Sequence, residues 1–208
     1  MHTTAAGRPA APAGAAAGRI GPNAITRVAE ALQQEFEAGR VAELFGLAGL
    51  EEYLHRPPQH MVDEQAVMRL HAVLRTQLPA EQARRISRDA GARTGAYLLA
   101  HRIPRPVQRL LRILPARAAS RVLAAAITRN AWTFAGTARF SARGGRPARF
   151  ALTGCPLCRG AQSDAACCDY YAACFEHLFG ALVHPRARVR ETSCAAAGAD
   201  ACRFEVAW

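Results

Sequence analysis

The segment WTFAGTARFSARGGRPARFALTG, residues 132–154, marks a change in the periodicity of the sequence. Trp132, Phe134 and Phe140 fall on one face at a spacing of two, which is typical of a β-strand. The glycine pair at 144–145 is a tight-turn signal, and the residues after it supply a returning strand. The segment therefore predicts an antiparallel hairpin and the start of a sheet.

Upstream of this hairpin the sequence has a helical period. Asn23 is expected to cap the first helix and Gly39 to close it. Prolines separate the following helices, because proline removes a backbone donor and clashes with the preceding turn. These helices are expected at about 41–54, 62–78, 80–100, 105–113 and 116–130.

Downstream, a helix is expected over 164–182, followed by strands at about 186–194 and 201–207. The fold class is therefore α+β: a helical N-terminal half packed on a C-terminal ββαββ unit with an antiparallel sheet. We expect an Ala/Gly/Pro-rich disordered tail over 1–21. A single domain should cover 22–208, with helices over 22–131 and the cysteine-rich sheet part over 132–208.

The charge of the chain comes from arginine alone. Its 208 residues include 27 cationic side chains, none of them lysine, and the net charge is +11. A GC-rich coding sequence would produce the same bias, and no motif for nucleic-acid recognition is present, so nucleic acid is not expected as a partner. Without an export signal we expect a cytoplasmic location, where the seven cysteines favour metal binding or free thiols over disulfides.

Two cysteines flank the small-residue loop between the last two expected strands, and Glu191 precedes the first of them. Zinc requires four converging N, S or O donors. The predicted ligands are therefore Cys168, Glu191, Cys194 and Cys202. Glu191 and Cys194 have opposite strand parity, so the strand must end or bulge between them. The competing interpretation is that these are small buried thiols, and Cys155 and Cys158 of the CPLC motif compete as ligands.

Three motifs carry a resemblance to a known family. VRETSCAAAGADACRFEV (189–206) resembles the closing motif of the 4-vinyl-reductase domain, and CDYYAACFEHLFG (168–180) resembles its helix. Together with GCPLCRG (154–160), they make residues 22–208 similar to the bacteriochlorophyll 4-vinyl reductase family of phototrophic bacteria. In the related domain of phenol-responsive activators, zinc is held by Cys, Glu, Cys and Cys. By motif, the resemblance implies the same four ligands here: Cys168, Glu191, Cys194 and Cys202.

The resemblance implies a role in bacteriochlorophyll biosynthesis beside the other enzymes of that pathway. The chain would bind a (proto)chlorophyllide-type Mg-tetrapyrrole and either carry it or assist reduction of its vinyl group. Whether it is an enzyme stays open, because no nicotinamide, flavin or iron–sulfur motif accompanies the family name and the reductant is unassigned. The alternative is a metal-stabilised sensor or adaptor that acts through protein partners. The oligomeric state, a homodimer included, is also open.

A tetrapyrrole needs an apolar surface, cations for its carboxylates and an axial ligand for magnesium. The stretch at 101–121 combines apolar residues with arginines. The predicted ligand-binding residues are Arg105, Arg109, Arg112, His101 and His177. An ordinary amphipathic helix pair with a solvated arginine face is the competing interpretation. Docking to an anionic membrane, as a peripheral protein of the photosynthetic membrane, is another.

Overall fold

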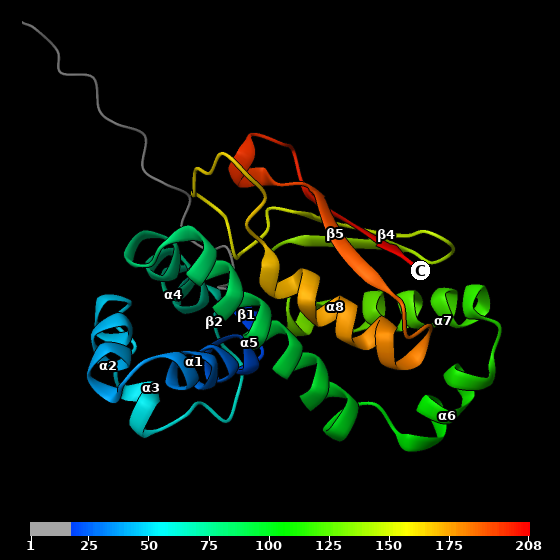
Figure 1. Cartoon of the computed structure of the whole chain (residues 1–208), viewed down its shortest axis with the longest axis horizontal. Helices are drawn as coiled ribbons and strands as arrows, with labels where there is room; N and C mark the ends of the chain where they lie inside the picture. The colour runs from blue at the N-terminus through cyan, green and yellow to red at the C-terminus, as the bar shows by residue number, and fades with distance from the viewer. Residues whose placement is uncertain (1–17) are drawn as a thin grey trace, which may run out of the picture.

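The computed structural model describes residues 18–208 (Figure 1). The expected tail of 1–21 therefore lies largely outside the described residues. Its last part is not a tail, however. Arg19–Ile20 forms a short strand, β1, that pairs with β2 (Val62–Asp63), and the side chain of Ile20 is buried.

The helical half contains the expected helices with shifted ends. They are α1 (Asn23–Glu35), α2 (Ala38–Leu47), α3 (Glu52–His55), α4 (Glu64–Gln77), α5 (Ala80–His101), α6 (Arg105–Ile113) and α7 (Ala116–Arg129). The expected helix at 41–54 is divided into α2 and α3 by a turn.

The expected ends of the first helix were wrong. Pro22 occupies the N-cap position, and Asn23 is already the first residue of α1. Proline suits a helix start because its missing N–H would have no partner there. The helix ends at Glu35, and Gly39 lies inside α2 instead of closing α1.

The sheet half is a four-stranded antiparallel sheet in the order β3-β4-β6-β5. Its strands are β3 (Arg139–Arg143), β4 (Ala148–Thr153), β5 (Arg188–Ser193) and β6 (Cys202–Ala207). The hairpin β3–β4 is confirmed, with Phe140 opposite Leu152 and Arg143 opposite Arg149. The 3₁₀ turns η1 (Ala131–Thr133) and η2 (Ala195–Ala197) lie before β3 and between β5 and β6.

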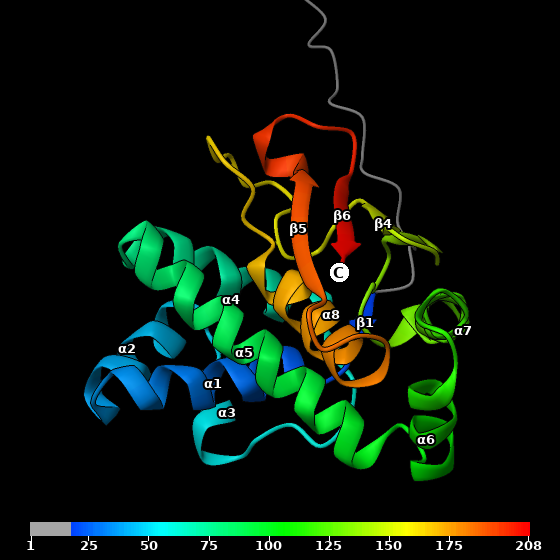
Figure 2. The same cartoon turned by 45° about the vertical axis from the view of Figure 1, so that its right-hand side comes forward.

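Helix α8 (Asp169–Leu182) lies between α5 and one face of the sheet (Figures 1 and 2). Phe175 of α8 is the centre of the contact, with its ring 4.8 Å from that of Phe150 on β4 and 5.7 Å from that of Phe204 on β6. Each buried aromatic ring removes a large apolar area from water and adds edge-to-face attraction. The expectation that Tyr170, Tyr171 and Phe175 belong to the core is confirmed.

Two element boundaries differ from the sequence expectation for the same reason. The strand expected from Trp132 begins only at Arg139, because the backbone N–H of Thr137 donates to the Glu64 carboxylate and not to a neighbouring strand. The helix expected from residue 164 begins only at Asp169, because the N–H of Cys168 donates to Glu191. In both places a carboxylate from a distant segment captures the backbone donor.

Candidate metal centre

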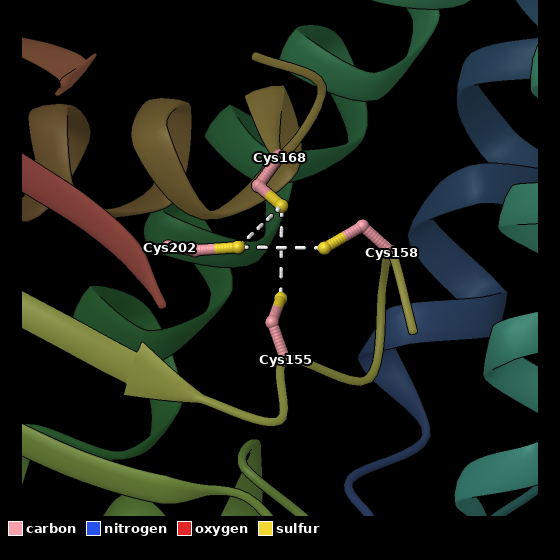
Figure 3. A group of neighbouring side chains, drawn as sticks. All are labelled: Cys155, Cys158, Cys168 and Cys202. Atoms are coloured by element: carbon pink, nitrogen blue, oxygen red, sulfur yellow. Dashed lines mark hydrogen bonds between the residues drawn. The ribbon is translucent and has the colours of Figure 1, made fainter. Parts of the chain in front are cut away.

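Cysteine side chains from three segments converge at one end of the sheet. Figure 3 shows Cys155 and Cys158 in the loop after β4, Cys168 just before α8 and Cys202 at the start of β6, with all four sulfurs directed toward a common centre. The four side chains are almost entirely buried. Residues far apart in the sequence, from Cys155 to Cys202, are thus brought together by the sheet and the helix.

The sulfur–sulfur distances among these four residues are short. Cys158 lies 3.3 Å from Cys202, and Cys168 lies 3.6 Å from both Cys155 and Cys202. Four thiolates at about 2.3 Å from a zinc ion would lie about 3.8 Å from one another in a tetrahedron. All four sulfurs lie within 4.8 Å of one another, so this first set fits a tetrahedral ion.

A second set shares two residues with the first. It consists of Cys168, Glu191, Cys194 and Cys202, whose donor atoms also lie within 4.8 Å of one another. The sulfur of Cys194 is 4.0 Å from that of Cys168 and 3.9 Å from that of Cys202. The structure therefore brings together all four metal ligands predicted from the sequence, and it adds Cys155 and Cys158 to the same cluster.

Glu191 supplies an independent sign that this region accommodates a cation. Its Oε2 accepts a hydrogen bond of 2.8 Å from the N–H of Cys168, whereas its Oε1 is buried and has no hydrogen-bond partner. Burial raises the pKa of Glu191 to about 8. A buried carboxylate oxygen without a partner is costly, and a metal ion would satisfy it.

The backbone reaches this geometry through the irregularity expected between Glu191 and Cys194. The pairing of β5 with β6 shifts register between Glu191 and Ser193. In a regular strand the two side chains would point to opposite faces, so the shift allows both to face Cys168. The predicted break in the strand is confirmed.

The thiols also perturb one another. Hydrogen bonds from Cys158 and the other surrounding thiols hold the pKa of Cys194 well below its usual value, whereas the neighbouring thiols, Cys155 first, raise the pKa of Cys168. A cluster of thiols that cannot all ionise together is relieved when a cation binds the thiolates. The donor chemistry, mostly sulfur with one carboxylate, is typical of zinc.

The loop that carries Cys155 and Cys158 is fixed by arginines on both sides. Arg75 of α4 donates to the carbonyl of Leu157 at 2.8 Å, and Arg159 donates to that of Gly154 at 2.7 Å. Arg159 also bonds Glu64 at 2.8 Å, which links the loop to the helical half. The loop begins and ends at glycines with φ of 74° and 73°, Gly154 and Gly160, a conformation that other residues rarely adopt.

The predicted ligand-binding residues do not gather in one place. Arg105 and Arg109 are exposed on α6, and Arg112 donates to the carbonyl of Ala181 at the end of α8. His101 is exposed at the end of α5, with its ring 4.7 Å from that of Tyr97.

His177 lies elsewhere, on the flank of α8. It lines a shallow pocket of about 310 Å³ between α5 and α8, together with Arg88 and Glu176. Glu176 is paired with Arg88 and with the N–H of Val189, so it does not orient the histidine ring.

Helix α6 is not an ordinary amphipathic helix with a solvated arginine face. Leu111 is its one buried residue, while Ile113 is 79% exposed and Leu110 50% exposed. Its apolar face therefore points outward, with Arg105 and Arg109 beside it. Figure 2 shows α6 at the edge of the molecule, away from β5 and β6.

No helix within residues 18–208 is both long enough and apolar enough to cross a bilayer.

Comparison with known proteins agrees with the cysteine motifs. A model of the 4-vinyl-reductase domain matches residues 149–207, the segment that contains β4, α8, β5 and β6. The bacteriochlorophyll synthase 23 kDa chain of Cereibacter sphaeroides is 45% identical over 192 residues, which is 92% of each chain. The protein of that name from Rhodobacter capsulatus is 37% identical over 186 residues, covering 89% of this chain and 85% of that one.

Solved structures of H-NOX proteins share the fold. One, a Cs H-NOX variant, superposes with a TM-score of 0.53 over 90% of this chain and 94% of that chain, at 13% sequence identity. A second H-NOX structure gives a TM-score of 0.52 over 90% and 93%, also at 13% identity. These likenesses concern the architecture alone. The identity to the curated relatives decides the family: the chain belongs to the 4-vinyl-reductase-domain proteins of phototrophic bacteria that include the bacteriochlorophyll synthase 23 kDa chain.

Proposed function

We propose that this protein acts in bacteriochlorophyll biosynthesis, where it binds a chlorophyllide-type Mg-tetrapyrrole and carries it between enzymes of the pathway. The observation that carries the proposal is the 45% identity, over 92% of both chains, to a protein named as a chain of bacteriochlorophyll synthase. An identity this high over the whole fold favours a shared role in the same pathway.

The metal ligands in this proposal are Cys168, Glu191, Cys194 and Cys202, holding a structural zinc ion. The unpartnered Oε1 of Glu191 and the burial of the three thiols support this assignment. Zinc would tie the start of α8 to both strands of the β5–β6 lip. A site enclosed on all sides suits a structural ion, since a catalytic zinc keeps one position open to water or substrate.

Helix α6 offers the surface for the pigment. Its exposed apolar residues Val107, Leu110 and Ile113 can contact the macrocycle, while Arg105 and Arg109 can bind the carboxylates. Arg112 would contribute at the other side of the helix, where it already contacts α8. His101, next to α6 in the chain, is the nearer candidate for an axial magnesium ligand, and His177 on α8 is the other.

An absorbance titration with Mg-protoporphyrin tests pigment binding. We expect a saturable shift of the Soret band with micromolar affinity. An Arg105→Gln/Arg109→Gln variant should bind at least about tenfold more weakly, because each lost charge-assisted hydrogen bond costs about 1.5–3 kcal/mol. Arg139→Gln/Arg143→Gln, two exposed arginines of β3, is the charge-matched control. No Soret shift at micromolar pigment would overturn the proposal.

The same helix favours peripheral contact with the photosynthetic membrane. A helix with an outward apolar face beside arginines is typical of segments that lie in the membrane–water interface. Each arginine near an anionic surface contributes about 1 kcal/mol of attraction. No aspartate or glutamate lies between Asp89 and Asp164, a stretch with thirteen arginines, so acidic side chains of that stretch do not oppose this attraction.

Co-sedimentation with vesicles of phosphatidylglycerol and phosphatidylcholine tests the membrane contact. The wild type should sediment with anionic vesicles and not with purely zwitterionic ones. Leu110→Glu/Ile113→Glu should abolish sedimentation, whereas Val122→Glu, an exposed apolar residue of α7, is the control and should retain most of it. Equal sedimentation of the α6 variant and the wild type would remove α6 as the contact surface.

A second candidate function is that of an adaptor that acts through protein partners. One observation favours it: the sheet face opposite α8 is exposed and rich in arginine. The exposed arginines of this face are Arg139, Arg143, Arg149, Arg188, Arg190 and Arg203. Of the acidic side chains, Glu205 of β6 alone lies among them on these strands, paired with Arg149 at 3.2 Å. Stable association with an acidic pathway enzyme, without any pigment uptake, would support the adaptor instead of the carrier.

A further inference from the structure

We propose that the cysteine cluster holds two metal ions that share the thiolates of Cys168 and Cys202. The inference rests on the proposed zinc site of Cys168, Glu191, Cys194 and Cys202, and adds a second ion bound by Cys155 and Cys158. Both ions are of the thiophilic divalent class, with zinc the first candidate.

The two tetrahedral sets share an edge. One set ends in Cys155 and Cys158, the other in Glu191 and Cys194, and both contain the Cys168–Cys202 pair, whose sulfurs lie 3.6 Å apart. Thiolate sulfur can bridge two zinc ions, as it does in modules where six cysteines hold two zincs. Here five cysteines and one carboxylate provide the same number of donors.

One ion would leave buried donors unused whichever set it chose. In the set with Glu191, the sulfurs of Cys155 and Cys158 remain buried without a ligand role, although both residues are 1% exposed. In the all-cysteine set, Oε1 of Glu191 remains buried and unpartnered. Two ions use all six donors.

The charges around the cluster favour a filled, anionic site. Five thiolates and one carboxylate carry six negative charges, and two dications supply four positive charges, with the thiol protons released to solvent. The guanidinium groups of Arg75 and Arg159 hold the Cys155–Cys158 loop and offset part of the remaining charge. The N–H of Ala195 also donates to the sulfur of Cys202 at 3.4 Å, a typical support for a shared thiolate.

The arrangement has one structural consequence. Cys158 and Cys194 become ligands of different ions, so their sulfurs, which lie 4.0 Å apart, must move away from each other. Both belong to loops and not to the central parts of strands. Cys158 follows β4 in a glycine-bounded turn, and Cys194 lies between β5 and η2.

Metal content per chain separates the possibilities. The full chain, purified under reducing conditions with zinc supplied and excess metal removed, should contain two zinc ions by mass spectrometry of the digested protein. One ion per chain would overturn the second ion and leave the proposed zinc site standing. No bound metal would remove both.

Paired variants assign each ion to its ligands. Cys155→Ser/Cys158→Ser and Glu191→Gln/Cys194→Ser should each retain one ion. Cys174→Ser, a buried thiol of α8 outside the cluster, is the control and should retain two. Two ions in the Cys155→Ser/Cys158→Ser variant would also overturn the proposal.

X-ray absorption at the zinc edge keeps the test independent of variants that fail to fold. The wild-type protein should show mostly sulfur scattering at about 2.3 Å. It should also show a zinc–zinc contribution at less than about 4 Å, the separation typical of two-metal sites. A spectrum without zinc–zinc scattering would contradict the shared thiolates.

Discussion

The Glu64 carboxylate is the residue that connects the two halves of the protein. It is 3% exposed and accepts hydrogen bonds from the N–H and hydroxyl of Thr137 and from Arg159. Burial acts to raise the pKa of Glu64, but the bonds from Thr137 and Arg159 outweigh it and hold the pKa below its usual value. The carboxylate is therefore charged and fully used.

Glu64→Gln should destabilise the protein by about 2–4 kcal/mol, because it leaves Arg159 without its charged partner and one hydrogen bond without an acceptor. Urea unfolding monitored by circular dichroism measures the change. Glu52→Gln, at an exposed ion pair with Arg56, is the control and should change stability by less than about 1 kcal/mol. Equal effects of the two substitutions would show that Glu64 does not connect the halves.

His71 should make the protein sensitive to acid. It is buried between α4 and α8 beside Tyr170, and its Nε2 has no hydrogen-bond partner. Burial first, and then the charge of Arg75, lower the pKa of His71 to about 3, from 6.5. Between pH 6.5 and 3 the unfolded chain therefore binds a proton that the folded chain does not, and stability falls as the pH falls.

The contribution of His71 to this slope is up to about 1.4 kcal/mol per pH unit. A His71→Phe variant should lose stability less steeply between about pH 6 and pH 4, as measured by urea unfolding at each pH. The carboxylates titrate in both proteins, so the difference in slope isolates the histidine. Parallel slopes for variant and wild type would contradict the assignment.

At the scale of elements, the closest packing in the protein joins α5 to α8. A Cβ at Gly91 would lie 2.2 Å from the carbonyl oxygen of Tyr170, too close for any side chain. Gly91→Ala should therefore destabilise by about 1–3 kcal/mol, although alanine favours helix. Gly180→Ala, on α8 with open space around it, should stabilise by about 0.5–1 kcal/mol in thermal unfolding. Stabilisation by Gly91→Ala would contradict the α5–α8 contact.

The sequence was sufficient to predict most elements and the members of one candidate ligand set, for identifiable reasons. The helices between prolines and the hairpin around the glycine pair at 144–145 depend on local signals, which the backbone follows. The break between Glu191 and Cys194 followed from strand parity alone. The predicted metal ligands depended on motif spacing, and the structure brings all four together.

The features that sequence reasoning missed depend on distant contacts. The backbone of Thr137 and that of Cys168 are captured by carboxylates of other segments, Glu64 and Glu191, so neither the strand nor the helix extends as far as its pattern. The outward apolar face of α6 was also missed. Periodicity shows that a helix has two faces, but not which face the rest of the fold covers. The participation of Cys155 and Cys158 stayed open because a CxxC motif alone does not identify its partners.

At the scale of the whole molecule, the metal centre should control global stability, because its ligands join the β4 loop, α8, β5 and β6. A strong chelator should lower the melting temperature of the purified protein by at least about 10 °C, since binding free energy of a structural ion is folding free energy. The same chelator should not shift the melting temperature of a Cys168→Ser variant. An unchanged wild-type melting temperature, with the metal shown to be removed, would contradict the structural role.

The proposed role as a carrier is tested most directly by following the pigment itself. Protein loaded with a divinyl Mg-tetrapyrrole is incubated with NADPH and anionic vesicles, and the pigment recovered from the vesicles is analysed by mass spectrometry. The carrier account predicts that the pigment moves to the vesicles with its mass unchanged, faster than from a Leu110→Glu/Ile113→Glu variant. A gain of two hydrogen atoms would show that the protein reduces the vinyl group, and that result would contradict the carrier account.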